Sequence, residues 1–322
     1  MTEYKRTGIS RVAVTGGTGF VGRRLVERLL AEGYAVRMLS RRDPEVVSEA
    51  LEVFSGDLLD ADTDLGMFLD GVDVIFHCAG EVRDKTRMQA LNVDATSRLL
   101  DAARGRQLHW VQLSSVGVYG ARGSGVITED TPVAPKNTYE KTKAAADELL
   151  LAISADEPMT WSILRPANIF GEGMLADGLG RISDVVKGGC FGQIGKGKHT
   201  VHYIYVDNII DALLLCMQDK RAVGRVFNIS DTNYMVDCIR IIAEFYGKNL
   251  SALSIPEWLF RALVTPFVIL PGFPLSMRTI DILLSNINYS RSRIENELGY
   301  DLRISLQEGM RRYLICREDG KI

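Results

Sequence analysis

A strand that runs straight into a glycine loop and then into a helix restricts the fold of this chain more than any other feature. The apolar segment RVAVT is followed by GGTGFVG, and the leucines and valines of VGRRLVERLLAEG then recur at helical spacing. In this setting the glycines let the backbone turn tightly and approach a pyrophosphate at the free amides of the helix start. The segment therefore predicts a dinucleotide site, with contacts from Gly16, Thr18, Gly19, Phe20, Val21 and Gly22.

Strand and helix patterns keep alternating beyond this unit. Three segments have the composition of strands and are bordered by turn residues: AVRMLS, LEVFSGD and GVDVIFHCAG. The pattern of a helix follows in MQALNVDATSRLLDAARG. A strand and a loop are then predicted from LHWVQLSSVGVYG. The alternation predicts an α/β fold. We expect a Rossmann-type, doubly wound parallel sheet with helices on both faces and ligands beyond the carboxyl ends of its strands.

The regular pattern loosens after WSILRPANIFG, residues 161–171, into glycine-rich sequence, and it returns in YVDNIIDALLLCM and RVFNIS. We predict a dinucleotide-binding Rossmann domain from residues 8–171, to which residues 204–230 return. Residues 172–203 and 231–322 are expected to form a smaller, irregular C-terminal lobe that binds the substrate.

Composition excludes several other classes of protein. The 322 residues carry a net charge of −3, so no basic field indicates a nucleic-acid partner. The five cysteines are scattered without a Cys-x-x-Cys pair and the histidines lack ligand spacing, which predicts neither disulfides nor a metal site. The N-terminus lacks the apolar region of a signal peptide, so the expected location is the cytoplasm.

One stretch, residues 252–275, is unusually apolar. Four prolines, together with Glu257 and Arg261, leave no uninterrupted run of the ~20 apolar residues that a membrane span needs. A lobe core with turns is the first interpretation of this stretch. A weak contact with a membrane surface or an apolar ligand is the alternative.

The end of the second strand bears on which dinucleotide is bound. An acidic side chain there would accept hydrogen bonds from the adenosine ribose of NAD, but this chain has Ser40, Arg41 and Arg42. Arginine suits a phosphate, so NADP is the predicted cofactor, with contacts from Ser40 and Arg41. A solvated turn is the alternative interpretation of these residues, and NAD is the alternative cofactor.

The segment NTYEKTKAAADELL places Tyr139 and Lys143 one turn apart on a predicted helix. Together with TGGTGFVG, GDLLD, DVIFHCAG, LNVDAT, LSSVGVYG, RPANIFG and YVDN, this Tyr-x-x-x-Lys pair resembles the extended branch of the short-chain dehydrogenase/reductase superfamily. That branch includes nucleotide-sugar epimerases and dehydratases, dihydroflavonol-type reductases and proteins like 3-beta-hydroxysteroid dehydrogenase. The resemblance covers nearly the whole chain.

The resemblance implies roles for individual residues. Ser115, Tyr139 and Lys143 would be catalytic, and Lys143 would also hold the nicotinamide ribose. A homodimer is also implied, commonly formed through the helix that begins at Tyr139. The remaining implied cofactor contacts are Asp57 and Leu58 at the adenine, Ala79 and Gly80 along the pyrophosphate, and Pro166 beside the nicotinamide.

Carbonyl reduction with a nicotinamide needs a hydride for carbon and a proton for oxygen, and the protein must supply the proton. Free tyrosine has a pKa near ~10, and the Lys143 cation would favour its phenolate. Ser115, from another strand end, would hydrogen-bond the substrate oxygen within reach of Tyr139.

Two residues of the predicted substrate side leave the reaction open. Asn168 matches a position that often contacts the diphosphate in sugar-nucleotide enzymes, whereas His202 stands near the place where those enzymes commonly have an arginine. We predict an NADP-dependent oxidoreductase that interconverts a ketone and a secondary alcohol, acting on a small molecule of moderately apolar character. The alternatives are a nucleotide-sugar epimerase or dehydratase with recycled NAD, and a non-catalytic protein that senses NADP.

Overall fold

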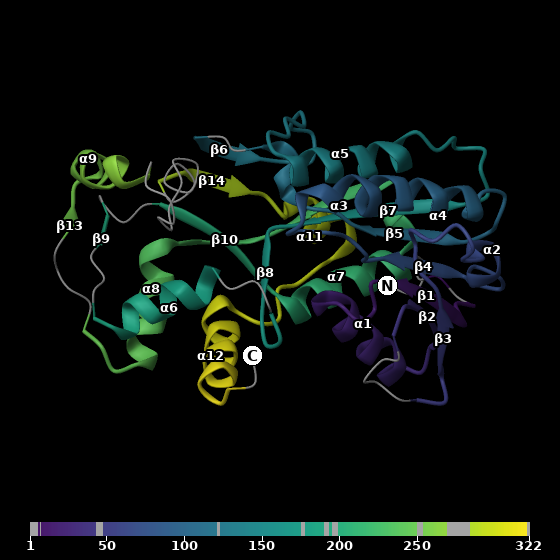
Figure 1. Cartoon of the computed structure of the whole chain (residues 1–322), viewed down its shortest axis with the longest axis horizontal. Coiled ribbons are helices and arrows are strands. Elements are labelled where there is room, and N and C mark those ends of the chain that lie inside the picture. Colours follow the sequence, from purple (N-terminus) through teal and green to yellow (C-terminus); the bar gives the residue numbers. More distant parts are fainter. Residues whose placement is uncertain are drawn as a thin grey trace.

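The computed structural model describes residues 6, 8–42, 48–120, 123–174, 178–189, 193–194, 199–249, 254–268 and 284–320. Figure 1 shows a large sheet enclosed by helices, with a lobe of short strands and helices beside it.

Seven parallel strands form the large sheet, and their order reverses between β1 and β4. This arrangement confirms the predicted Rossmann-type fold, in which a ligand is expected at the point of reversal. In sheet order the strands are β11 (Arg225–Ile229), β7 (Thr160–Pro166), β5 (His109–Leu113), β4 (Val74–His77), β1 (Arg11–Thr15), β2 (Ala35–Ser40) and β3 (Leu51–Ser55).

Both faces of this sheet are buried, which explains why its central strands are almost continuously apolar. On β1, Val12 and Val14 belong to one apolar cluster and Ala13 to another, as the two-residue period of a strand requires. The first cluster packs under α1 (Phe20–Ala31), α7 (Val206–Gln218) and α11 (Ser292–Leu298). The second packs under α2 (Leu65–Phe68), α4 (Ala95–Ala103) and α5 (Thr138–Leu151).

The helix predicted from MQALNVDATSRLLDAARG is interrupted in the structure. A π-helical turn, Ala90–Asp94, joins α3 (Lys85–Gln89) to α4. Turns of this kind are frequent at functional sites. The buried residue of this turn is Asn92, which is only 2% exposed.

The smaller lobe has its own apolar core. Phe170 stands edge-on to Tyr205, with ring centroids 5.6 Å apart, and both are almost fully buried. The elements of the lobe are β8 (Asn168–Phe170), β10 (Thr200–Tyr205) and β12 (Asp231–Tyr234) in one sheet, β9 (Gln193–Ile194) with β13 (Ser254–Ile255), and the helices α6 (Gly178–Lys187), α8 (Met235–Phe245), α9 (Glu257–Val268) and α12 (Leu306–Glu318).

A short parallel pair joins the middle of the chain to a segment near its C-terminal end. β14 (Asn286–Tyr289) pairs with β6 (Ser124–Ile127), which follows the loop of the predicted catalytic serine. Ile294 and Leu298 of α11 pack in the core of the large sheet, although the proposed division assigns residues 231–322 to the lobe. The division into a Rossmann domain and a substrate lobe stays a prediction.

Of the apolar stretch 252–275, residues 252–253 and 269–275 lie outside the described residues. The described part forms β13 and α9, on which Trp258 is 70% exposed and Leu263 56% exposed. Within the parts of the chain that the structure describes, no helix combines the length and the apolar character needed to cross a membrane. The contact with a membrane surface or an apolar ligand stays a prediction.

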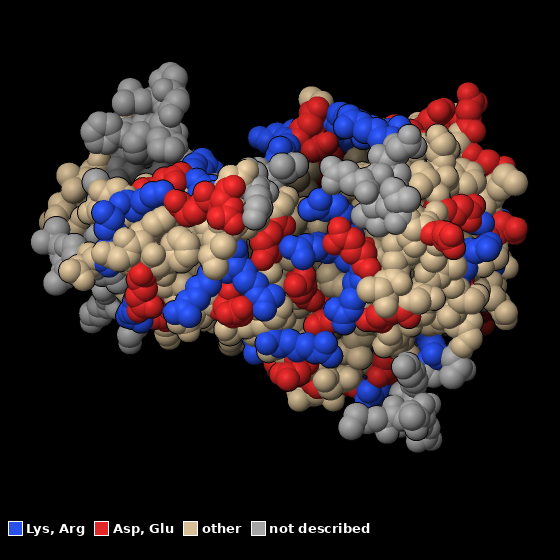
Figure 2. All heavy atoms as spheres, turned by 90° about the horizontal axis from the view of Figure 1, so that it is seen from below, with Lys and Arg blue, Asp and Glu red and all other residues tan. Residues whose placement is uncertain are grey.

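Acidic and basic side chains are interspersed on the face shown in Figure 2. Neither sign forms a broad continuous area there, which agrees with the small net charge of the chain.

Candidate active site

A cavity of about 800 Å³ lies at the point of strand reversal, beyond the carboxyl ends of β1, β4 and β5. Loops that follow four strands of the large sheet line it, and Met174, Leu179 and Tyr203 of the lobe close its other side. The predicted site residues that line it are Gly16, Gly19, Phe20, Val21, Gly22, Ala79, Gly80, Ser115, Tyr139, Lys143, Pro166 and Asn168.

The glycine loop forms a cradle that side chains would fill. Gly16 has a φ of +70°, and a Cβ there would lie 2.6 Å from the backbone nitrogen of Ala79. A Cβ on Gly22 would overlap the carbonyl of Gly16, so only glycine lets α1 pack against the loop. The first turn of α1 has no acidic residue and no side-chain cap, which leaves its amides to a ligand. The cradle fits the pyrophosphate of a dinucleotide.

The residues predicted to contact the adenosine part of the cofactor differ from one another in their exposure and their hydrogen bonds. Arg41 is 60% exposed, and its Nη1 lies 3.4 Å from Oδ2 of Asp57 at the end of β3. The Ser40 hydroxyl donates to the carbonyl of Arg42 at 2.5 Å, so it is already used within the turn. Leu58 is buried in the core under α4. These four positions lie outside the main cavity, as does the exposed Thr18 at the tip of the glycine loop.

The loop after β4 is held by Asn92, whose role the sequence analysis did not predict. Its Oδ1 accepts from the nitrogen of Glu81 at 2.7 Å, and its Nδ2 donates to the carbonyl of Glu81 and to Oγ1 of Thr142, both at 3.0 Å. Asn92 thereby fixes Ala79 and Gly80 relative to α5. In the sequence, only its polar side chain within the apolar repeat of ALNVDAT indicated that Asn92 has a special role.

The start of α5 is fixed by a capping box. Oδ1 of Asn137 accepts from the nitrogen of Glu140 at 2.9 Å, and Oε2 of Glu140 accepts from the nitrogen of Asn137 at 3.3 Å. The Asn-x-x-Glu spacing in NTYE carries this signal. Because the helix therefore begins at Thr138, Tyr139 lies in its first turn and Lys143 one turn further along the same face.

Ser115 and Tyr139 meet in the cavity from different elements. Ser115 caps the 3₁₀ turn Val116–Tyr119, where its Oγ accepts from the nitrogen of Gly117 at 3.0 Å. The hydroxyl groups of Ser115 and Tyr139 both line this cavity. Burial raises the pKa of Tyr139 above the value of free tyrosine, and the Ser115 side chain opposes this shift. The pair can therefore hold a substrate oxygen between two hydroxyls.

Lys143 lies on the floor of the same cavity and is 6% exposed. Its Nζ donates to the carbonyl of Leu113, the last residue of β5, at 2.6 Å. Burial lowers the pKa of Lys143, and the nearby Asp147 carboxyl opposes the shift. A cation held one turn from Tyr139 favours the phenolate form of the tyrosine.

His77 is a buried hydrogen-bonding residue, not an exposed acid or base. Thr96 donates its hydroxyl proton to the carbonyl of Asn92, so its oxygen accepts from Nε2 of His77 at 2.9 Å. Nδ1 of the ring is then the acceptor for the Thr15 hydroxyl at 2.7 Å. Burial lowers the pKa of His77 to about 3, which keeps the ring neutral at pH 7.

A second cavity, of about 560 Å³, adjoins the first and shares Ser115, Tyr139 and Asn168 with it. His202 lines this cavity, but its two ring nitrogens lie 3.2 Å from Oγ1 of Thr232 and 3.4 Å from Oγ1 of Thr200. Burial lowers the pKa of His202 to about 4. The ring is thus a neutral part of the wall.

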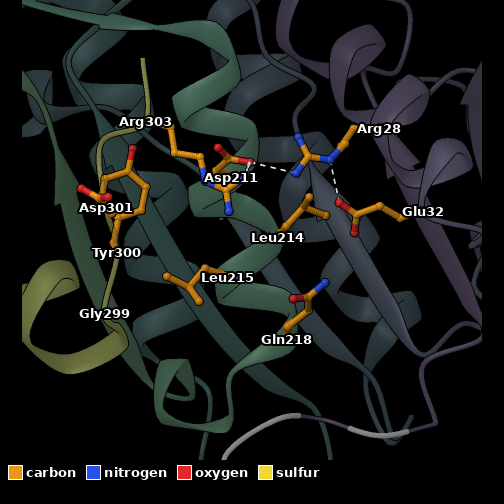
Figure 3. Close-up of a pocket in the computed structure, with 10 residues that line it drawn as sticks. All are labelled: Arg28, Glu32, Asp211, Leu214, Leu215, Gln218, Gly299, Tyr300, Asp301 and Arg303. Atoms are coloured by element: carbon orange, nitrogen blue, oxygen red, sulfur yellow. Dashed lines mark hydrogen bonds and ion pairs between the residues drawn. The ribbon is translucent and has the colours of Figure 1, made fainter. Parts of the chain in front are cut away.

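Another hollow lies away from the glycine loop, between α1, α7 and residues 299–303 (Figure 3). Nε of Arg28 donates to Glu32 at 2.6 Å and its Nη2 to Asp211 at 3.0 Å, while Nη1 of Arg303 lies 3.7 Å from Asp211. Carboxylates therefore engage both arginines of this hollow, and none of the predicted site residues lines it.

The large sheet with a glycine cradle at its strand reversal defines a dinucleotide-binding Rossmann protein, and Ser115, Tyr139 and Lys143 lie beside the cradle in the same cavity. The model of the NAD dependent epimerase/dehydratase family matches residues 12–230. The chain belongs to this family, within the extended branch of the short-chain dehydrogenases/reductases, whose enzymes use NAD(P).

Relatives within the family have different activities. A 3 beta-hydroxysteroid dehydrogenase/Delta 5-->4-isomerase of Mycobacterium tuberculosis is 29% identical, over 94% of this chain and 89% of that protein. A UDP-glucose 4-epimerase of Vibrio cholerae is 27% identical, over 93% of each chain. The solved structure of MoeE5 in complex with UDP-glucose and NAD superposes with a TM-score of 0.75 and 25% identity, over 97% of this chain and 99% of that one.

Proposed function

We propose that this protein is an NADP-dependent oxidoreductase that interconverts a ketone and a secondary alcohol, with Tyr139 as the proton donor and acceptor. The observation that carries the proposal is that Ser115, Tyr139 and the buried Lys143 line one cavity at the edge of the glycine cradle. These three groups supply what a carbonyl needs during reduction, and a bound nicotinamide supplies the hydride.

In the reducing direction the substrate oxygen accepts hydrogen bonds from Ser115 and Tyr139. As the carbonyl carbon gains the hydride, negative charge develops on oxygen and the Tyr139 hydroxyl transfers its proton to it. The resulting phenolate is stabilised by the Lys143 cation. In the oxidising direction the phenolate accepts the proton of the alcohol, so the same groups serve both directions.

The character of the second cavity supports a moderately apolar substrate. Val116, Ala167, Ile287 and Tyr289 contribute to its wall, and His202 is neutral at pH 7 and supplies no charge for a diphosphate. The similarity to a 3 beta-hydroxysteroid dehydrogenase over nearly the whole chain is consistent with a substrate of this kind.

A nucleotide-sugar epimerase or dehydratase with recycled NAD is the second candidate. Lys136, Arg261 and Asn168 line the second cavity, and these polar groups could meet a diphosphate. Relatives named as UDP-glucose 4-epimerases favour it as well.

The fate of the cofactor separates these two functions. We expect the purified protein to oxidise NADPH in proportion to the ketone reduced, in a screen of ketones, alcohols and sugar nucleotides monitored by NADPH absorbance. Nucleotide released by denaturing the purified protein should be identified in parallel. Tightly retained NAD, with a sugar nucleotide converted and no net cofactor consumed, would establish the second candidate instead.

The preference for NADP depends on Arg41. Replacing Arg41 by alanine is expected to weaken NADPH binding about 10-fold to 100-fold, because a charge-assisted bond to the 2′-phosphate is lost, and to leave NADH binding almost unchanged. Fluorescence titration of both nucleotides into the apoprotein measures this. Arg104→Ala, which removes another exposed arginine charge directly after α4, is the control. Equal NADPH affinity in Arg41→Ala and the parent protein would remove the argument for NADP.

The homodimer implied by the superfamily is part of the proposal. It would use α5, whose last residue, Leu151, is 48% exposed.

A further inference from the structure

A buried carboxyl group lies one turn beyond Lys143 and has no part in the proposed chemistry. Asp147, on α5, is 1% exposed. Its Oδ2 accepts from Oγ of Ser114 at 2.8 Å and from Nε of Arg165 at 2.9 Å. Its Oδ1 is also buried and has no hydrogen-bond partner among the described residues. A carboxyl group in such a place is costly unless its charge is used.

The carboxyl group is held by a chain of buried hydrogen bonds that begins at Arg165. Nη1 of Arg165 donates to the hydroxyl of Tyr119 at 2.9 Å, and that hydroxyl donates to Oδ1 of Asn228 at 2.9 Å. Arg165 is the strongest influence that keeps the pKa of Asp147 from rising further with burial. The guanidinium therefore favours the ionised carboxylate close to Lys143.

Lys143 has few other groups that could balance its charge. Besides Tyr139, which burial keeps neutral at pH 7, the titratable side chains near it are His77 and Cys78 at the end of β4. Burial raises the pKa of Cys78 to about 12 and lowers that of His77 to about 3, so both are neutral at pH 7. Asp147 is then the carboxylate whose charge reaches the Lys143 ammonium.

We propose that Asp147 is a positioning residue that keeps Lys143 protonated, with Arg165 and Ser114 holding its carboxylate in place. This inference rests on the proposed function of Tyr139 and Lys143. In this proposal the Arg165–Asp147 pair stabilises the charge of Lys143 in addition to stabilising the fold. By bonding Ser114, the same carboxylate also fixes the residue next to Ser115.

Titration of Lys143 itself tests the proposal without a substrate. The protein is labelled with [ε-13C]lysine, the Lys143 signal is assigned by its loss in Lys143→Met, and its chemical shift is followed with pH. Asp147→Asn is expected to lower the titration midpoint of Lys143 by about one pH unit or more, because the carboxylate charge is lost. Asp147→Glu, which keeps the charge, should restore most of the shift.

Two further variants separate charge from packing. Ser114→Ala removes a hydrogen bond to Asp147 but no charge, so the Lys143 midpoint should stay near that of the parent protein. Asp147→Asn leaves the Arg165 guanidinium buried without its partner, and this variant can fail to fold. The double variant Asp147→Asn/Arg165→Gln removes both charges, and a lowered midpoint is expected there too. An unchanged midpoint in the folded variants, or an equal shift in Ser114→Ala, would overturn the proposal.

Kinetics then show whether the charge matters for turnover. The alkaline limb of the kcat profile should move to lower pH in Asp147→Asn, since Lys143 loses its proton earlier, and return in Asp147→Glu. If the Lys143 midpoint falls as expected but the profile does not move, the electrostatic inference stands and the proposed role of Lys143 in turnover is wrong. If neither changes, Asp147 is a structural residue only.

Discussion

Replacing Tyr139 by phenylalanine is expected to lower kcat for ketone reduction by about 10²-fold to 10⁴-fold, the usual range for loss of a general acid. The ring, its packing and the start of α5 would remain, while the hydroxyl that faces the cavity beside Ser115 is lost. Steady-state rates of NADPH oxidation, compared with the parent protein at saturating ketone, measure the effect.

Two control measurements are needed to interpret the loss of turnover in Tyr139→Phe. NADPH binding to Tyr139→Phe should stay within a few-fold of the parent value, because the cradle around Gly16 and Gly22 is untouched. Ser115→Ala should also lose turnover, since it removes the other hydroxyl that meets the substrate oxygen. Undiminished turnover in Tyr139→Phe would disprove the assignment of the proton donor. A protein that binds NADPH but turns over no carbonyl compound would support the NADP-sensing alternative.

Replacing Gly22 by alanine is expected to weaken dinucleotide binding about 10-fold to 100-fold and to lower the free energy of unfolding by about 1–3 kcal/mol. The new methyl group would overlap the carbonyl of Gly16, so α1 must move away from the loop that receives the pyrophosphate. Fluorescence titration with NADPH and chemical denaturation measure the two effects.

Gly188→Ala is a suitable control for this substitution. Gly188 follows α6, where a Cβ would meet nothing closer than 3.4 Å and the backbone has no left-handed conformation. The Gly188→Ala variant should therefore bind the dinucleotide with the affinity of the parent protein. Equal affinity in Gly22→Ala would mean that the cradle tolerates a wider loop and that the pyrophosphate lies elsewhere.

The fold was predictable from the chain because each central strand and helix repeats one simple pattern. The central strands are largely apolar on both faces, as buried parallel strands must be, in RVAVT, AVRMLS and GVDVIFHCAG. The glycine loop marks the place where the first strand ends and the first helix begins. The small lobe was less predictable. Its strands have two to six residues and pair across long gaps in the chain, so local patterns carry little of their pairing.

The site was predictable where a motif has a local spacing. Tyr139 and Lys143 lie four residues apart on one helix, and the glycines lie in one loop, so their grouping follows from the sequence. Asn92 and Asp147 were not assigned roles, because their importance comes from partners 11 to 50 residues away, such as Glu81, Thr142 and Arg165. The polar residue in the apolar repeat of ALNVDAT marked Asn92 as unusual, but it did not identify these partners.

His202 illustrates a different limit of the sequence. Its position three residues before YVDN pointed to the substrate side, and it does line the second cavity. The structure adds that two threonine hydroxyls and the edge-on ring of Tyr289 surround it, which makes the imidazole a neutral wall residue. Its protonation state could not be read from its place in the chain.

The pairing of β6 with β14 has a consequence for how the protein is made. The glycine cradle and the loop after β4 lie within the first 92 residues, whereas the wall of the second cavity needs Ile287 and Tyr289. During synthesis the glycine loop therefore leaves the ribosome long before the segment that completes the wall of the second cavity. Because α1 packs in one apolar cluster with α7 and α11, the core beneath the loop is also completed only by the last part of the chain.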